Sequence, residues 1–307
     1  MSGMNAVLVF PGQGSQRIGM LDDIPELEAL DRLLDAAEAL TGRDLRRLQR
    51  EGTPAEIADT RVAQPLLYLA DWAWGRVLLD VGVSPVAVAG HSLGELAALA
   101  VAGVHSVEAG LELVCERALL MAEAVAERPG SMAAVLGLEG QTVAEVLENA
   151  SGVWVANDNA PGQIVISGLR DSVASAGNAL LSAGARRVIP LDVAGAFHSP
   201  LMQQAADRFS RLLDVTEFHE ARVPVVQNAR PEPATDASEI RSALADQIAS
   251  PVRWTETMHA LARYEPVTLV EAGPGSVLRG LAKRVDGISA VSVEDTDVQA
   301  LVEEVLR

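Results

Sequence analysis

The chain has 307 residues, of which 49% are hydrophobic, and a formal net charge of −18 at pH 7. This length and apolar content predict one large domain, or a large domain with an insertion, around a sizeable core. The acidic balance argues against a nucleic-acid or membrane-surface role, and no stretch approaches the roughly 20 apolar residues of a membrane span. Cys115 is the only cysteine, which excludes an intrachain disulfide and is typical of a reducing cytoplasm.

The first part of the chain alternates strand-like and helical runs. Strands are predicted at Ala6–Phe10 and just before Gly90, and helices over about 25–40, 65–81, 95–100 and 106–126. The start of the chain lacks the basic residues of a signal peptide, so its apolar run is interpreted as a first strand. Alternating units of this kind favour a parallel sheet covered by helices on both faces.

The pattern changes after residue 130. The predicted order is strand 131–138, helix 142–150, strand 153–157, strand 163–168, helix 171–183 and strand 186–193. This β-α-β-β-α-β order is typical of the split βαβ, or ferredoxin-like, unit, with Asn159 in the turn between its two middle strands. We therefore predict an α/β fold with a small subdomain, 128–196, inserted into a large domain formed by 1–127 and 197–307.

The rest of the chain would complete the sheet of the large domain. The predicted elements are helix 199–213, strand 223–227, helices near 239–249 and 254–263, strand 267–271, helix 276–284 and strand 290–293. The proline-rich loop 228–237 is expected to be exposed.

A G-x-S-x-G motif, Gly90–Gly94, lies between a predicted strand and a predicted helix. This is the context of a nucleophile elbow, in which a sharp turn lifts the serine hydroxyl clear of the sheet. The unpaired N–H groups at the start of the following helix would then face any negative charge that develops there. The motif predicts that Ser92 is a nucleophile; the alternative is a glycine-rich turn whose serine caps the helix.

A serine nucleophile needs a base, and the chain has five histidines. His91 adjoins the serine, but neighbouring residues in a tight turn point apart. His105 and His219 lie in polar, loop-like surroundings, and His259 lies in a predicted helix. His198 follows the last strand of the small subdomain and precedes a helix, a place where a rigid scaffold holds catalytic residues. We therefore predict His198 as the base, against the alternative that it caps that helix.

Acyl transfer also needs donors for an oxyanion. The first strand runs into Pro11-Gly12-Gln13-Gly14, whose glycines free the backbone of Gln13 to turn its N–H outward. In a parallel sheet this loop leaves the same edge as the elbow, so the N–H groups of Gln13 and Leu93 are the predicted pair. A dinucleotide fingerprint does not fit, because the third glycine it needs is replaced by Arg17.

Arg117 is the most unusual charged residue, because apolar residues flank it on the same side of its predicted helix. An arginine in such surroundings is costly to bury unless an anion meets it. It is either a structural ion pair or snorkelling side chain, or a bidentate clamp for a substrate carboxylate.

Motifs along nearly the whole chain form one set. They are Phe10–Gln16, Gln64–Leu67, Gly90–Glu95, Arg117, Asn159–Gln163, Ala196–Pro200, Gln247 with Pro251–Trp254, and Glu271–Gly275. With this set the chain resembles the malonyl-CoA:acyl-carrier-protein transacylases of fatty-acid synthesis and the related acyltransferase domains of polyketide synthases. The resemblance implies an α/β-hydrolase-like large domain, the ferredoxin-like subdomain and a ping-pong transfer without metal or cofactor.

The resemblance also implies a role for each matched residue. Ser92 attacks the malonyl thioester with His198 as base, and an oxygen near Gln247, rather than an Asp, orients that base. The backbone of Gln13 and Leu93 binds the oxyanion. The implied substrate contacts are Arg117 for the carboxylate, Asn157 and Asn159 for the pantetheine arm, and Gln64 and Phe197. Phe197, directly before the base, goes with malonyl, whereas Gly195 replaces a bulkier residue of many relatives and leaves room for a larger acyl group.

The implied partners are malonyl-CoA and an acyl carrier protein, with the enzyme expected to be a cytoplasmic monomer. Carrier proteins of this type are usually acidic, so docking on a chain of −18 needs a local basic patch. The predicted patch is Arg186, Arg187, Arg279, Lys283 and Arg284. The open alternatives are a serine hydrolase or esterase with an acidic partner for the histidine, the malonyl-transfer subunit of malonate decarboxylase, a discrete acyltransferase of a polyketide synthase, and a non-enzymatic acyl-binding protein.

Overall fold

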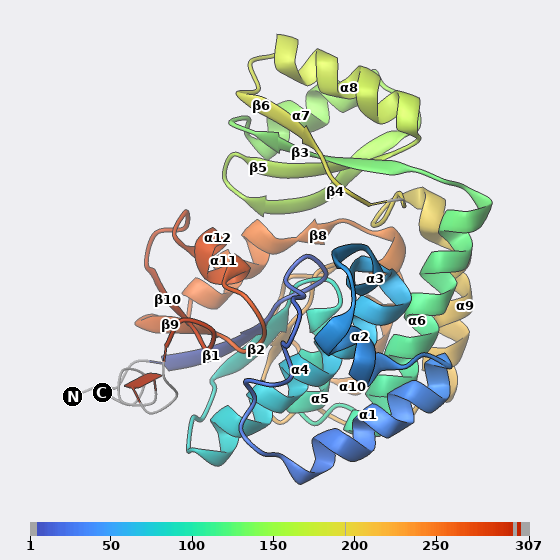
Figure 1. The fold of residues 1–307 in the computed structure, drawn as a ribbon. Coiled ribbons are helices and arrows are strands. Elements are labelled where there is room, and N and C mark those ends of the chain that lie inside the picture. Colours follow the sequence, from blue (N-terminus) through green and yellow to red (C-terminus); the bar gives the residue numbers. More distant parts are fainter. Residues whose placement is uncertain (1–4, 194, 297–299, 302–307) are drawn as a thin grey trace.

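The computed structural model describes residues 5–193, 195–296 and 300–301, and two sheets organise them (Figure 1). In the first sheet the strand order is β10-β9-β1-β2-β7, and every neighbouring pair is parallel. Its strands are β1 (Asn5–Phe10), β2 (Ala87–Gly90), β7 (Val225–Val226), β9 (Val267–Glu271) and β10 (Ile288–Ser292). The parallel sheet predicted for the large domain is therefore present.

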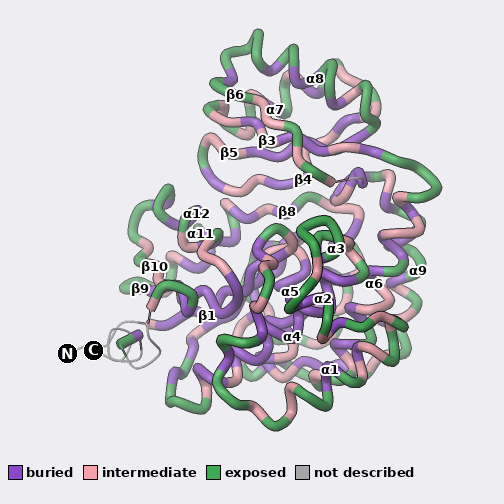
Figure 2. Tube along the Cα trace, viewed as in Figure 1, coloured by how far each residue is buried: buried purple, intermediate pink, exposed green. Residues whose placement is uncertain are grey.

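Helices cover both faces of this sheet (Figures 1 and 2). Along β1, Leu8 and Phe10 pack with α1, α4, α5, α6 and α9, whereas Val7 and Val9 pack with α11 and α12 on the opposite face. This alternation follows from the two-residue period of a strand. The helices are α1 (Glu28–Thr41), α2 (Leu45–Glu51), α3 (Pro54–Ala58), α4 (Thr60–Asp80), α5 (Gly94–Val101), α6 (Val107–Glu127), α9 (Gln203–Val215), α10 (Ala237–Asp246), α11 (Trp254–Ala262) and α12 (Val277–Ala282).

The second sheet has the order β6-β3-β5-β4-β8 and is antiparallel except for the pair β4–β8. Its elements are β3 (Ser131–Leu136), α7 (Gly140–Leu147), β4 (Val153–Ala160), β5 (Gln163–Gly168), α8 (Arg170–Ser182), β6 (Arg187–Pro190) and β8 (Val252–Arg253). The helices α7 and α8 pack on one face of the sheet, the face turned away from the larger part in Figure 1. The predicted β-α-β-β-α-β order is confirmed, while the exact domain bounds stay a prediction. Residues 1–4, 194, 297–299 and 302–307 within those bounds lie outside the described part.

Three local predictions were wrong. The helix α4 begins at Thr60, capped by the Asp59 side chain, so Pro65 lies inside it and not at its start; the ring removes one helical hydrogen bond there. The strand β4 continues to Ala160, so Asn159 is a strand residue. The two-residue strand β8 was missed, because so short a run carries no alternating pattern.

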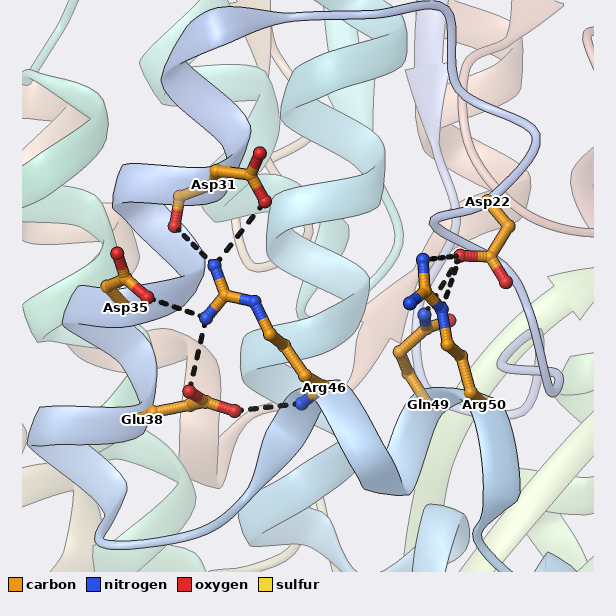
Figure 3. A network of polar contacts seen from close by, with 7 residues as sticks. All are labelled: Asp22, Asp31, Asp35, Glu38, Arg46, Gln49 and Arg50. Carbon is orange, nitrogen blue, oxygen red and sulfur yellow. Dashed lines mark hydrogen bonds and ion pairs between the residues drawn. The ribbon is translucent and has the colours of Figure 1, made fainter.

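A network of ion pairs on the surface orients α2, one of the short helices that the sequence did not predict. Arg46 at the start of α2 meets three acidic residues of α1 (Figure 3). They are Asp31, Asp35 and Glu38. Exposed ion pairs each contribute about 1 kcal/mol or less, so this network orients α2 on α1 while the buried Leu45 and Leu48 provide most of the packing energy.

Candidate active site

The elbow is built from strand β2, a turn and helix α5, as the G-x-S-x-G motif predicted. A Cβ added at Gly90 would lie 2.0 Å from the carbonyl carbon of Gly94, and one added at Gly94 would lie 2.1 Å from the Phe10 carbonyl oxygen. Ser92 itself has φ +51°, a left-handed conformation that L-residues adopt only at a cost. Backbone crossings this close require glycine on both sides of Ser92.

Substituting Gly90 tests this packing directly. Gly90→Ala is expected to lower the free energy of unfolding by about 3 kcal/mol or more, because the new methyl group meets rigid backbone. Gly280→Ala is the matched control, since nothing lies within 4 Å of a Cβ added at Gly280 in α12, and there alanine favours the helix by about 0.5–1 kcal/mol. Chemical denaturation measures both; equal stabilities of the two variants would contradict the tight elbow.

His198 lies against the serine in the geometry of a nucleophile and its base. Its Nε2 is 2.7 Å from Ser92 Oγ, and its Nδ1 lies 3.2 Å from the carbonyl oxygen of Gln247 and 3.1 Å from that of Ser250. Two carbonyl acceptors at Nδ1 assign the proton to that nitrogen, which leaves the lone pair of Nε2 facing the hydroxyl. Among the non-glycine residues that the structure describes, only Ser92 and His198 have positive φ, and such strain concentrates at functional sites.

Burial keeps the His198 imidazole neutral. The residue is 4% exposed; desolvation, followed by electrostatic interaction with Arg117 and then with His91, lowers its pKa to about 3. At pH 7 the group is therefore unprotonated and ready to accept a proton.

Arg117 in α6 is a buried cation whose partners are neutral. Its side chain is 1% exposed. Nη1 donates to Gln64 Oε1 at 2.7 Å, and Nη2 donates to Gln247 Oε1 at 2.9 Å and to Ser92 Oγ at 3.2 Å. Desolvation lowers its pKa to about 10, with the carboxylate of Glu95 acting in the opposite direction, so the group stays charged at pH 7. Within the described residues no carboxylate forms an ion pair with it, which leaves the charge available to an anionic ligand.

A pocket of about 400 Å³ joins these groups, and both parts of the molecule line it. The sequence-predicted residues on its wall are Gln13, Gln64, Ser92, Leu93, Arg117, Asn157, Asn159, Phe197 and His198. Gln247 lies behind this wall, where its Nε2 donates to the Ser92 carbonyl oxygen at 2.9 Å. The structure thus brings all ten predicted site residues together.

The structure adds two details about residues near the catalytic pair. A Cβ at Gly195 would lie 2.4 Å from Val125 Cγ2 and 2.7 Å from Phe197 Cε1, so neighbouring side chains fill the space beside Gly195, while room for a larger acyl group stays a prediction. His91 is turned away from the serine, as expected. Its Nε2 lies 2.8 Å from Asn159 Oδ1. This contact fixes the amide of Asn159 on the pocket wall.

Sequence reasoning missed a buried polar group beside the elbow. Asn228 was placed in an exposed loop but is fully buried, and its Oδ1 accepts from the Ser92 N–H at 2.6 Å. The signal that would have found it is its place directly after a predicted strand, because strand ends of a parallel sheet meet at the edge where the elbow lies. Three residues of α12 also line the pocket; they are Val277, Leu278 and Leu281.

Two searches of the described residues were negative. No group of three or more His, Cys, Asp or Glu side chains there is arranged to hold a metal ion. Within the same residues, every helix is too short or too polar to cross a membrane.

The chain is similar to known proteins over nearly its whole length. Residues 7–304 match the family model described as the acyl transferase domain. The malonyl CoA-acyl carrier protein transacylase of Escherichia coli (strain K12) is 40% identical over 298 residues, which are 95% of this chain and 96% of that protein. The structure of the malonyl CoA-acyl carrier protein transacylase from Coxiella burnetii superposes with a TM-score of 0.93 at 34% identity, covering 99% of both chains. A malonyl-transacylase solved in complex with a type II PKS acyl-carrier protein gives a TM-score of 0.89 at 39% identity, covering 98% of this chain and 99% of that one.

Proposed function

Since this chain belongs to the acyl transferase family, we propose that it moves a malonyl group from the thioester of malonyl-CoA to the phosphopantetheine thiol of an acyl carrier protein, with Ser92 holding the group in between. The relatives named above carry out this transfer according to their names, and one of them was solved with its carrier protein. The enzyme is an acyltransferase, and the acyl-serine intermediate is the part of the mechanism that its own geometry supports.

One observation carries this proposal: the pair Ser92–His198 and the buried cation Arg117 share one pocket. Nη2 of Arg117 is 3.2 Å from the serine oxygen, and that oxygen is 2.7 Å from the imidazole. A malonyl group has a thioester carbonyl at one end and a carboxylate at the other. Bound with its carboxylate on the guanidinium, it places the carbonyl carbon beside the hydroxyl.

The transfer then takes place in two matched halves. Ser92 Oγ attacks the thioester carbon while its proton passes to His198 Nε2, and the departing CoA thiolate takes that proton. The carrier thiol next gives its proton to the same nitrogen and attacks the acyl-serine, whose oxygen is reprotonated as the malonyl group leaves. We propose that the N–H groups of Leu93 and Gln13 stabilise the oxyanion of both steps.

The orientation of the base separates this site from that of a typical serine hydrolase. Backbone carbonyls of Gln247 and Ser250 accept from the Nδ1–H of His198, where a hydrolase triad has an aspartate or glutamate. Neutral acceptors stabilise the imidazolium less, which suits a thiolate leaving group of low basicity. The Gln247 side chain joins the same network by accepting from Arg117 and donating to the elbow.

The test of the function compares thiol and water as acceptors. Malonyl-CoA is mixed with the enzyme, with or without a phosphopantetheinylated carrier protein, and malonyl-carrier and free malonate are both quantified. We expect malonyl-carrier to form much faster than malonate. Rapid malonate release that the carrier does not suppress would instead assign the protein to the hydrolases.

We propose that the predicted carrier-docking patch borders the pocket. Arg186, Arg187, Lys283 and Arg284 are exposed, and the last two directly follow α12, which lines the pocket. Arg284 Nη1 donates to the carbonyl oxygen of Pro161 at 3.3 Å, which ties this end of the patch to the second sheet. Arg279, the fifth member, is paired with Asp295 at 2.9 Å. We therefore propose the four unpaired cations, counted among the described residues, as the carrier-binding charges.

Reversing this charge is expected to weaken carrier docking alone. Lys283→Glu with Arg284→Glu should lower kcat/KM for the carrier about tenfold at low salt and less at high salt, because the attraction is screened. Acylation by malonyl-CoA should stay unchanged. Arg32→Glu with Arg211→Glu is the matched control, since both are exposed, on α1 and α9, without an ion pair among the described residues. Equal carrier kinetics in the two double variants would contradict the patch.

We propose further that a single copy of the chain acts on its own in a reducing cytoplasm. All ten site residues come from one chain, and Cys115 is its only cysteine. The acceptor decides whether fatty-acid or polyketide synthesis, or a malonate decarboxylase, is served. Carrier proteins from each system, offered in parallel in the assay above, assign it.

A further inference from the structure

Asn228 holds the elbow from both sides of the nucleophile. It follows β7, the strand next to β2, so its side chain meets the elbow at their common sheet edge. Its Nδ2 donates to the Gly90 carbonyl oxygen at 2.6 Å, and its Oδ1 accepts from the Ser92 N–H at 2.6 Å. One amide thus bonds the peptide groups that flank His91, within the turn that sets the direction of Ser92.

Two further hydrogen bonds hold the backbone of Asn228. Its N–H donates to Glu95 Oε2 at 2.8 Å, and its carbonyl oxygen accepts from the Arg253 N–H at 3.2 Å. Glu95 is completely buried in the first turn of α5, and Arg253 belongs to β8, which pairs with β4 of the second sheet. All four polar groups of a residue that is 0% exposed are therefore satisfied.

These bonds matter because the conformation of Ser92 is strained. At φ +51° the backbone conformation costs about 1 kcal/mol or more relative to an ordinary one. Such a conformation persists only when surrounding contacts stabilise it. Asn228 also occupies the N–H of Ser92 itself. The N–H of Leu93 is thereby left as the elbow's donor to an oxyanion.

We propose that Asn228 is a positioning residue for Ser92, holding the elbow so that Oγ stays aligned with His198 Nε2, and that Glu95 fixes Asn228 in turn. This inference rests on the proposed function, because its effect is measured in the acylation of Ser92. It differs from a purely structural role in that it concerns the chemical step and not the binding of malonyl-CoA.

The first test removes the amide. Asn228→Ala is expected to lower kcat/KM for acylation by malonyl-CoA about 10²-fold, the scale of a misplaced reacting group. Malonyl-CoA affinity, measured by calorimetry with Ser92→Ala and with Ser92→Ala/Asn228→Ala, should agree within about threefold. Asn5→Ala is the matched control, because the Asn5 amide also donates to a carbonyl, that of Tyr264 at 2.7 Å, but at the amino-terminal end of β1, opposite the elbow. Both variants are assayed about 10 °C or more below their unfolding midpoints.

A second variant tests the positioning role of Asn228 even if Asn228→Ala does not fold. Asn228→Asp keeps an oxygen for the Ser92 N–H, but its other oxygen can donate to Gly90 only while the carboxyl is protonated. Glu95 is the carboxylate that faces this position. We expect acylation by Asn228→Asp to be slower than by the unaltered enzyme, most clearly at the alkaline end of the pH range assayed, because an ionised carboxylate lacks the donor to Gly90 and places two oxygens against each other.

Each outcome has one meaning. Acylation by Asn228→Ala, or by Asn228→Asp at the alkaline end of the range, within about threefold of the unaltered enzyme overturns the positioning role. If the unaltered enzyme itself forms no malonyl-serine, the proposed function fails, and that result is distinct from either of these.

Discussion

Ser92→Ala is expected to leave a folded protein that takes up no malonyl group and transfers malonyl at least about 10⁴-fold more slowly, as in other enzymes that lose their nucleophile. The hydroxyl is the only group in the pocket within 2.7 Å of the His198 Nε2 among the residues described. Alanine retains the Cβ, so the tight turn between Gly90 and Gly94 is undisturbed. Mass spectrometry after mixing with malonyl-CoA measures the adduct.

Ser167→Ala is the matched control for this experiment. Ser167 is as deeply buried as any residue, lies on β5 of the second sheet, and its hydroxyl has no hydrogen-bond partner among the described residues. Its substitution should leave the malonyl adduct unchanged. A full adduct on Ser92→Ala would remove Ser92 from the mechanism.

Arg117→Ala is expected to abolish the preference for malonyl over neutral acyl groups. A buried charge that loses its partner costs about 3–5 kcal/mol, so a neutral acyl group facing Arg117 is disfavoured by about 10²- to 10³-fold in kcat/KM. Removing the guanidinium abolishes this selectivity: malonyl transfer falls and acetyl transfer rises relative to it. The sign holds across neutral pH, because a pKa of about 10 keeps Arg117 charged there. Competing malonyl-CoA and acetyl-CoA in one reaction measures the ratio.

A second arginine separates charge recognition from general damage. Arg241 in α10 is partly buried, donates to the Thr216 carbonyl oxygen at 3.1 Å and lies over the Phe218 ring. Arg241→Ala should lower stability without changing the malonyl-to-acetyl ratio. An unchanged ratio in Arg117→Ala would reduce that residue to a structural role.

The parts of the fold that the sequence predicts well are those with strong local signals. The elbow has glycines at both positions where a Cβ would meet backbone, and β5 and β9 are short apolar runs with clear ends. The helix α6 begins at Val107, within one residue of the predicted start, and the Ser106 hydroxyl caps it by accepting from the Ala109 N–H. In these places local chemistry and tertiary packing agree.

The parts that the sequence did not show have either an overlooked local signal or distant contacts. Pro65 suggests a helix start, but its helix begins five residues earlier, at Thr60, where the adjacent Asp59 supplies the cap. His105 seemed to lie in a polar loop, yet it is 3% exposed with its ring against Phe218. Asn228 lies in a stretch rich in proline and polar residues, and only the pairing of β7 with β2 carries it to the elbow. The contacts of His105 and Asn228 join residues more than one hundred positions apart and leave no periodic trace.

The candidate site was predictable in its residues but not in its connections. Motifs indicated Ser92, His198 and Arg117, while the structure shows that Gln247 links them, through its backbone to the base and through its side chain to Arg117. A residue type cannot indicate which of its atoms is used. That Arg117 meets only neutral partners within the described chain is likewise a property of the folded state.

The central claim, that Ser92 carries malonyl between two thiols, is tested most directly by mass spectrometry of the unaltered enzyme. The enzyme is mixed with malonyl-CoA, its mass is measured and its peptides are mapped, and a phosphopantetheinylated carrier protein is then added. We expect the enzyme to gain one malonyl group on the peptide that contains Ser92, and to lose it as the carrier gains one. No adduct, an adduct on another residue, or an adduct lost to water at the same rate without the carrier would contradict the claim.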